Sequence, residues 1–266
     1  MNPIEAALLG IVQGLTEFFP VSSSGHLALL QELFGGRDGE ELFFEIVVHV
    51  ATLVAIVLFY RMRILALVRG FFARERESVE YVGKLAVATL PIVVVGVTAK
   101  EWIASQFANP SLVGGALLVS GGIVLTTRWT ARSNQCAEGA GKTVPSWPAA
   151  ILIGLAQSLA ILPGLSRSGS TVAAALALGL TPRAAAEFSF LLGIIAISGA
   201  AVLILPDLSA SDPEQIVNLG IGAATALVSG LLALSLFVRM LDRQLFHHWA
   251  WYCWAVGGWF LVWSSV

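Results

Sequence analysis

Two short polar segments, 144 residues apart, carry the side chains of this chain that are best suited to chemistry. The first holds Glu17, Ser23 and His26, and the second holds Arg167 at the position that aligns with Ser23. A carboxylate and an imidazole can transfer protons, and a carboxylate can also hold a cation. A guanidinium binds phosphate oxygens through two parallel hydrogen bonds. The pattern therefore predicts proton chemistry in one segment and anion binding in the other.

The two segments are altered copies of one pattern. At the positions of Glu17 and His26 the second copy has Ile161 and Ser170. The two copies therefore differ in their ionisable side chains but share a set of Gly, Gln and Ser residues. Five pairs of residues keep both their type and the offset of 144 residues: Gly10/Gly154, Gln13/Gln157, Ser22/Ser166, Ser24/Ser168 and Gly25/Gly169.

The composition excludes a soluble domain. The chain is 57% hydrophobic and 12% charged, with a mean hydropathy of +0.83, whereas soluble proteins carry about 25% charged residues. Apolar runs of about 20 residues recur and do not alternate as barrel strands do. We therefore expect an all-α, polytopic protein of the lipid bilayer, with no nucleic-acid partner. Six transmembrane helices are expected, at 42–60, 85–104, 111–127, 187–206, 215–238 and 248–265.

The cationic residues set the orientation of these spans. A loop at 61–84 carries six Lys and Arg residues, and the positive-inside rule places it in the cytoplasm. Tracing the chain from there puts 12 of the 15 Lys and Arg residues on the cytoplasmic side, provided that 1–41 and 148–183 each enter and leave on one side. Both segments are apolar stretches broken by Pro, Ser and Gly. They are therefore predicted to be re-entrant helical hairpins, at 4–35 and 149–180.

Each half of the chain contains one hairpin, which does not cross the bilayer, and three spans, so each half makes an odd number of crossings. The single membrane domain, 1–266, is thus predicted to contain two inverted-topology repeats, 1–127 and 148–266. Broken helices at matching places in inverted halves indicate a binding site near the midplane of the bilayer. The first hairpin opens outward, so the site is expected to face the outer side. Inverted repeats are also common in transporters, so the architecture alone does not separate an enzyme from a carrier.

Both broken segments resume as half-helices after their serines, and the free N–H groups of a helix N-terminus favour anions. Two such termini converging on one point would bind phosphate strongly. Glu17 is a strong candidate because ionisable groups inside a membrane protein are costly and usually functional. The predicted catalytic residues are Glu17, His26 and Ser23, with Glu17 also the predicted metal ligand; either Ser23 or a water is the attacking group. The predicted substrate-binding residues are Arg167, Ser22, Ser24, Gly25, Ser166, Ser168, Gly169, Thr171 and Gln13.

Other polar residues are given structural roles. Gln13 and Gln157 suit hydrogen bonds between helices as well as contacts with a substrate. His49 lies among apolar residues of a span and is expected to pack in the core. Cys136, in a polar loop, and Cys253, in the last apolar run, predict no disulfide framework.

The motifs resemble those of the undecaprenyl-diphosphate phosphatases, also known as bacitracin-resistance proteins. The resemblance extends over essentially the whole chain. It rests on 14–26 (GLTEFFPVSSSGH) and 163–171 (PGLSRSGST), supported by 44–52 (FEIVVHVAT) and 186–191 (AEFSFL).

This resemblance implies a bacterial inner-membrane enzyme that removes the terminal phosphate from the C55 polyprenyl diphosphate carrier. Together with the charge count, it predicts a site that faces the periplasm. The product is reused in cell-wall synthesis, and the activity confers bacitracin resistance. By position, the resemblance makes Glu17, His26 and Ser23 catalytic and Arg167 the residue that binds the diphosphate.

The resemblance also implies a divalent cation, Mg²⁺ or Ca²⁺. Some members of the family have a second glutamate where this chain has Gln13. The cation is therefore expected to be bound here by Glu17, the substrate's own phosphates and water. A transporter or flippase of a polyprenyl phosphate lipid is the alternative from another class. The oligomeric state is left open, a homodimer included.

Overall fold

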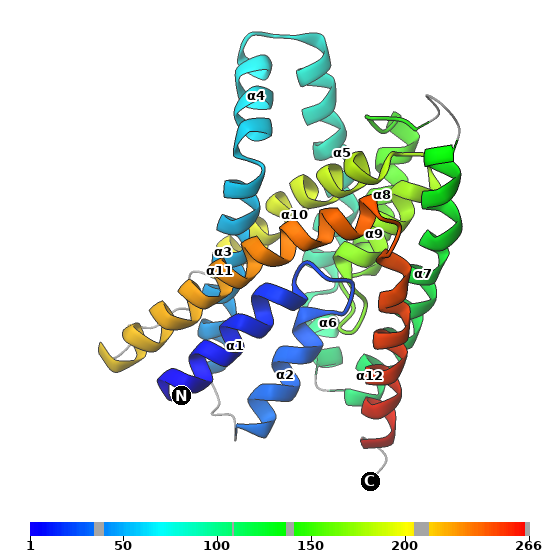
Figure 1. Ribbon diagram of the computed structural model, residues 1–266. Coiled ribbons are helices and arrows are strands. Elements are labelled where there is room, and N and C mark those ends of the chain that lie inside the picture. The colour runs from blue at the N-terminus through cyan, green and yellow to red at the C-terminus, as the bar shows by residue number, and fades with distance from the viewer. Residues whose placement is uncertain (35–39, 108, 137–140, 205–212, 264–266) are drawn as a thin grey trace.

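The computed structural model describes residues 1–34, 40–107, 109–136, 141–204 and 213–263, and within these ranges it is helical, without strands (Figure 1). The first seven helices are α1 (Pro3–Thr16), α2 (Ser23–Leu33), α3 (Glu40–Phe59), α4 (Arg61–Phe72), α5 (Arg76–Thr98), α6 (Lys100–Phe107) and α7 (Pro110–Cys136). The others are α8 (Trp147–Leu159), α9 (Arg167–Ala177), α10 (Pro182–Ile204), α11 (Pro213–Asp242), the 3₁₀ turn η2 (Phe246–His248) and α12 (Trp249–Trp263).

Four of the described helices, α5, α7, α10 and α11, are long and apolar enough to cross a bilayer. The pair α3 and α4, bent by 74° at its break, makes a fifth if it counts as one span. The chain is therefore a multi-pass, all-α membrane protein, as its composition predicts. The sixth expected span, 248–265, corresponds to α12, whose 15 described residues are fewer than a crossing helix needs. The count of six spans is not confirmed.

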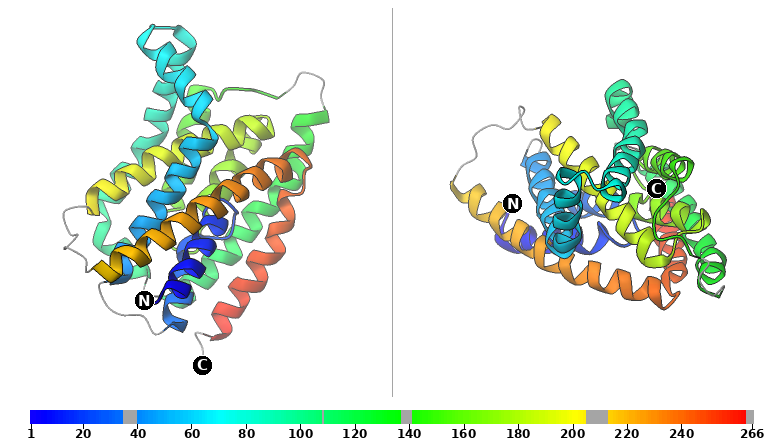
Figure 2. Two further views of the ribbon diagram at one scale, coloured as in Figure 1. Left: turned by 60° about the vertical axis from the view of Figure 1, so that its left-hand side comes forward. Right: turned by 90° about the horizontal axis from the view of Figure 1, so that it is seen from above.

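The predicted loop at 61–84 is wrong, because this segment is helical over most of its length. Residues 61–72 form α4 and α5 already begins at Arg76, so the two helices make a hairpin that projects from one end of the molecule (Figure 1, Figure 2). Besides its arginines, α4 contains Leu and Ala, and all three residue types favour helices. α7 likewise continues to Cys136, which lies on a helix rather than in a loop.

Both segments that were expected to be re-entrant consist of a helix, a loop and a second helix. α1 and α2 are joined by 17–22, and α8 and α9 are joined by 160–166. Figure 1 shows both loops near the middle of the molecule, with α1 and α2 leading to one end and α8 and α9 leading to the other. Residue 35, the expected end of the first hairpin, lies outside the described residues.

Glycines allow these segments to pack closely on long helices. α1 packs along α11, and α8 packs on α5. A Cβ at Gly10 or Gly14 would overlap atoms of α11, and a Cβ at Gly154 would overlap the backbone of α5. Small residues at helix interfaces let backbones approach in this way in membrane proteins. The close packing fixes where each broken segment lies.

Aromatic rings hold the first loop between two neighbouring helices. Phe18 packs edge-on against Phe190 of α10, with 5.7 Å between ring centroids. Phe19 stacks on Trp249 at the start of α12, with 4.4 Å between centroids. Both phenylalanines are buried, and such ring pairs contribute beyond the area that they bury. The loop that follows α1 is thus fixed on two sides.

Candidate active site

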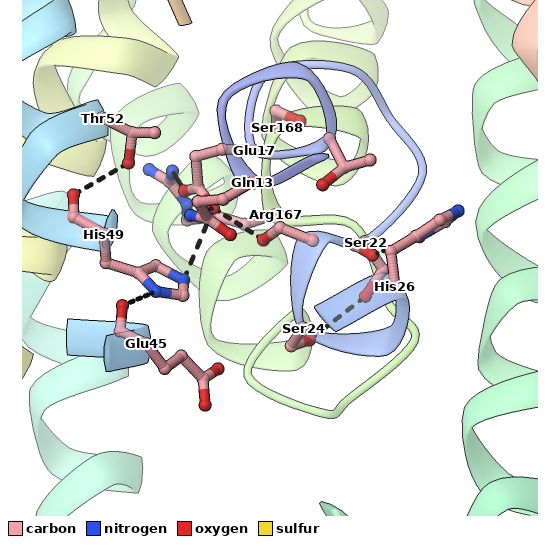
Figure 3. A network of polar contacts seen from close by, with 12 residues as sticks. Gln13, Glu17, Ser22, Ser24, His26, Glu45, His49, Thr52, Arg167 and Ser168 are labelled. Carbon is pink, nitrogen blue, oxygen red and sulfur yellow. Dashed lines mark hydrogen bonds and ion pairs between the residues drawn. The ribbon is translucent and has the colours of Figure 1, made fainter. Parts of the chain in front are cut away.

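Glu17 is the point where the buried polar side chains meet. It follows the last residue of α1, and its side chain is 6% exposed. Its Oε1 accepts a hydrogen bond from Arg167 Nη2 at 2.6 Å, and its Oε2 accepts from Ser23 Oγ at 2.7 Å. Gln13 Nε2 also donates to Oε2, at 3.2 Å. Figure 3 shows Gln13, Glu17 and Arg167 converging, so side chains from both loops share one carboxylate.

Local backbone structure accounts for this arrangement in the first loop. Gln13 and Glu17 are four residues apart, so they lie on one face of α1. Pro20 lies in the turn that follows, and Ser22 then takes a φ of +64°. This left-handed conformation costs a non-glycine residue about 1–2 kcal/mol, and such strain collects at functional sites. The chain is thereby turned so that Ser23, the first residue of α2, reaches back to Glu17.

The serines predicted to bind substrate form the same kind of pair in each loop. Ser22 and Ser24 have their Oγ atoms 3.3 Å apart, and Ser166 and Ser168 have theirs 3.2 Å apart. Ser168 Oγ also donates to the carbonyl of Phe19, at 3.4 Å. The pairs therefore serve at least to shape the loops and hold them together.

The remaining predicted contacts of the second loop organise the start of α9. Ser166 caps this helix, since its Oγ accepts from the backbone N–H of Gly169 at 3.1 Å. Its own N–H donates to Ser120 Oγ of α7, at 3.0 Å. Thr171 Oγ1 donates to the carbonyl of Arg167 at 2.8 Å, one turn back. These bonds fix the helix start from which the guanidinium of Arg167 extends to Glu17.

Glycines let the two loops touch. The backbone N–H of Gly164, which has a φ of +91°, donates to Ser22 Oγ at 3.2 Å. A Cβ at Gly169 would lie 2.8 Å from Cβ of Pro20, and one at Gly25 would lie 3.2 Å from α7. The predicted glycines Gly25 and Gly169 thus permit close approach, and their contacts here are with the protein itself.

His26 lies apart from the other predicted catalytic residues. Its Nδ1 is 2.8 Å from the carbonyl oxygen of Ser22, and its Nε2 is 2.8 Å from the hydroxyl of Tyr252 on α12. A carbonyl only accepts, so Nδ1 carries the hydrogen and Nε2 accepts from the tyrosine. Figure 3 shows the imidazole pointing away from Glu17. The structure therefore places Glu17, and not His26, in contact with Ser23.

The expectation for His49 is wrong. This side chain does not simply pack in the core, because its Nε2 lies 3.6 Å from Oε2 of Glu17. The sequence did contain a signal, since an ionisable residue inside an apolar span is costly. Tyr252 and Gly193, which borders the guanidinium of Arg167, carried no such signal. Among the described residues, no three His, Cys, Asp or Glu side chains gather as a metal site.

The helices and the buried polar centre define the class: a multi-pass membrane protein in which two broken helical segments meet at an ionic, serine-rich site. Within that class, the match of a family model to residues 6–259 shows that the chain belongs to the family of bacitracin resistance protein BacA.

Similar proteins from several bacteria carry the name undecaprenyl-diphosphatase. The protein of Syntrophotalea carbinolica is 35% identical over 100% of both chains, and that of Desulfosudis oleivorans is 39% identical over 97% of both. A third, from Acinetobacter baumannii strain ATCC 17978, is 34% identical over 94% of this chain and 91% of its own. The likeness therefore includes both broken segments and the helices that hold them.

Proposed function

We propose that this chain hydrolyses undecaprenyl diphosphate to undecaprenyl phosphate and inorganic phosphate. The observation that carries the proposal is the shared carboxylate of Glu17, which accepts from Arg167 Nη2 at 2.6 Å and from Ser23 Oγ at 2.7 Å. An anion-binding group and a hydroxyl thus lie beside one base. A transporter or flippase needs the first but not the second, and the relatives are named as hydrolases. Both facts favour the enzyme.

Substrate binding is proposed to exchange the partner of Arg167. A diphosphate offers oxygens that match the planar fork of a guanidinium, so Arg167 turns from Glu17 to the substrate. The N-termini of α2 and α9, which begin at Ser23 and Arg167, add N–H groups that favour an anion. Glu17 then loses its ion pair with Arg167 but keeps the hydrogen bond from Ser23, whose proton it can accept. Binding and activation of the base are thereby linked.

Ser23 is the proposed nucleophile, because its hydroxyl already donates to Glu17. Glu17 takes the proton as Ser23 Oγ bonds to the terminal phosphorus. The bond from that phosphorus to the bridging oxygen breaks, and undecaprenyl phosphate leaves. Water then attacks the phosphoserine and gives its proton to a base, for which His26 is proposed, while Glu17 returns its proton to Ser23 Oγ and inorganic phosphate leaves. Direct attack by a water held at Glu17 is the alternative.

The residues around Glu17 fit the divalent cation that the resemblance implies. The carbonyl oxygen Oε1 of Gln13 is buried and has no hydrogen-bond partner among the described residues. A carboxylate and an amide carbonyl are ligand types that Mg²⁺ and Ca²⁺ prefer. Such a cation, when bound, would neutralise charge on the phosphates during transfer.

The proposed location is the bacterial inner membrane, with the site open to the periplasm. The arginines of the α4–α5 hairpin support this orientation, because they mark one end of the molecule as cytoplasmic while α1 and α2 lead to the other end (Figure 1). The matched packing of α1 on α11 and of α8 on α5 supports the inverted repeats 1–127 and 148–266. The activity would recycle the lipid carrier for cell-wall synthesis and confer bacitracin resistance.

The test is phosphate release from undecaprenyl diphosphate by the purified protein in detergent, with and without EDTA. Release that EDTA abolishes and that is lost in Glu17→Ala is the expected result. Arg183→Ala is the control, because it breaks the exposed pair between Arg183 and Asp242 and should leave release intact. Folded protein that releases no phosphate under any of these conditions would contradict the proposal.

Gly193→Ala is expected to lower kcat/KM for phosphate release by roughly 10²-fold, mainly through a higher KM. A Cβ at Gly193 of α10 would overlap the guanidinium of Arg167 and displace it. Gly199→Ala on the same helix is the control, because a Cβ there meets nothing within 4 Å. Equal kinetics for both variants would show that α10 does not position Arg167.

Tyr252→Phe is expected to lower kcat by about tenfold, the effect of losing roughly one hydrogen bond, while KM stays unchanged. The variant removes the hydroxyl that holds Nε2 of His26. Tyr81→Phe is the control, since it also loses a hydroxyl bond, to Glu187, but elsewhere in the protein. Steady-state kinetics of both variants make the comparison. An equal loss of kcat in both variants would show that the hydroxyl of Tyr252 contributes only to the stability of the protein and does not act through His26.

A further inference from the structure

His49 lies on α3 and turns its side chain toward the site. Its Nδ1 is 2.7 Å from the carbonyl oxygen of Glu45, one turn back on the same helix. Because a carbonyl only accepts, Nδ1 carries a hydrogen, and in the neutral form of the ring the lone pair is on Nε2. Figure 3 shows this nitrogen directed at Glu17.

The gap between His49 and Glu17 separates two acceptors. Nε2 and Oε2 are 3.6 Å apart, which is too long for a hydrogen bond. A carboxylate has about four lone-pair positions, and the donors from Arg167, Ser23 and Gln13 use three of them. Oε2, which faces His49, accepts from Ser23 and, at the longer distance of 3.2 Å, from Gln13, so a cation at Oε2 would take the place of the Gln13 donor. Two acceptors in this relation favour a cation between them.

The separation of the two atoms suits a metal ion. Two ligand atoms each about 2.1 Å from one ion at a tetrahedral angle lie about 3.4 Å apart. The observed 3.6 Å between Nε2 and Oε2 is within a few tenths of that value. The third acceptor beside them is Oε1 of Gln13, which is buried and without a hydrogen-bond partner in the described part of the chain.

We infer that His49 Nε2 is a ligand of a divalent cation, together with Glu17 and the amide oxygen of Gln13. That substrate phosphates complete the coordination depends on the proposed function. The assignment of the three protein ligands does not depend on it. The oxygen ligands Glu17 and Gln13 alone would suit Mg²⁺ or Ca²⁺, whereas adding a nitrogen ligand makes Ca²⁺ less favourable and also admits Mn²⁺, Co²⁺ or Zn²⁺. The site is therefore a mixed nitrogen and oxygen site rather than an all-oxygen one.

The experiment uses Mn²⁺ alone, added to the purified full-length protein in detergent without substrate. Electron paramagnetic resonance reports the free Mn²⁺ and hence the Kd, and its spin-echo modulation reports nitrogen bound to the metal. The wild type should show nitrogen coupling, and growth on ¹⁵N-histidine should change it to the ¹⁵N pattern. His49→Gln should remove the coupling and raise the Kd by about tenfold or more.

His248→Gln is the matched control. His248 also has its Nδ1 against a backbone carbonyl, that of Leu245, at 3.0 Å, and its side chain is exposed on the η2 turn. This variant should keep both the coupling and the Kd of the wild type.

Bound Mn²⁺ without histidine nitrogen coupling in the wild type would overturn the inference, and so would coupling that survives in His49→Gln. The ¹⁵N-histidine measurement on the wild type holds even if the variant fails to fold. Phosphate release is measured on the same preparations. Release without nitrogen coupling would contradict the metal ligand alone, whereas coupling without release would support the ligand and contradict the proposed function.

Discussion

Arg167→Gln should reduce phosphate release by at least about 10³-fold, because it removes the group proposed to bind the diphosphate and stabilise the transferring phosphoryl. It should also lower the free energy of unfolding by about 3–5 kcal/mol, since it leaves the buried carboxylate of Glu17 without its ionic partner. Phosphate release and unfolding in a denaturing detergent measure the two effects separately.

The double variant Glu17→Gln with Arg167→Gln separates stability from activity. Removing both charges should recover most of the lost stability, because neither is then left unpaired in the interior. Activity should stay absent, since both the base and the anion-binding group are gone. A double variant no more stable than Arg167→Gln would show that the pair is not one buried unit. The exposed pair of Arg183 and Asp242, removed in the same way, is the control and should change neither quantity.

Local signals in the sequence were enough for the class of fold. The high hydropathy and the recurring apolar runs predicted a multi-pass helical protein, and Pro20 with the following serines predicted where α1 gives way to α2. The α4–α5 hairpin was missed because its many arginines are also typical of a cytoplasmic loop. The span expected at 248–265 is not confirmed, because α12 has 15 described residues and residues 264–266 lie outside the described part of the chain.

For the site, the sequence predicted which residues gather there better than it predicted which of them are in contact. Aligning the two copies placed Ser23 opposite Arg167, and both now meet at Glu17. Contacts made through tertiary packing were not predictable in this way. His26 is held by a tyrosine 226 residues further along the chain, and no local pattern connects the two. The core role predicted for His49 follows from its apolar neighbours in sequence, whereas its contact with Glu17 is made through tertiary packing.

Ser23→Ala should lower phosphate release by at least about 10⁴-fold if Ser23 is the nucleophile, since removing such a group leaves only binding and charge stabilisation. Acid quenching of the wild type during turnover of substrate labelled in its terminal phosphate should trap the label on Ser23. Ser24→Ala is the comparison, because Ser24 is the next residue of the same helix turn and contacts Ser22 rather than Glu17. It should still form the labelled phosphoserine.

The two mechanisms left open by the sequence differ in what Glu17 is for. If Ser23 attacks, the 2.7 Å hydrogen bond to Glu17 is the path of the proton, and losing either residue stops the first chemical step. If water attacks, Ser23 only orients the carboxylate, and Ser23→Ala should keep release within about tenfold, as expected for one lost hydrogen bond. Such residual activity, with no label on the protein, would contradict the covalent path. It would leave Glu17 as the base for water, because the carboxylate is required in both schemes.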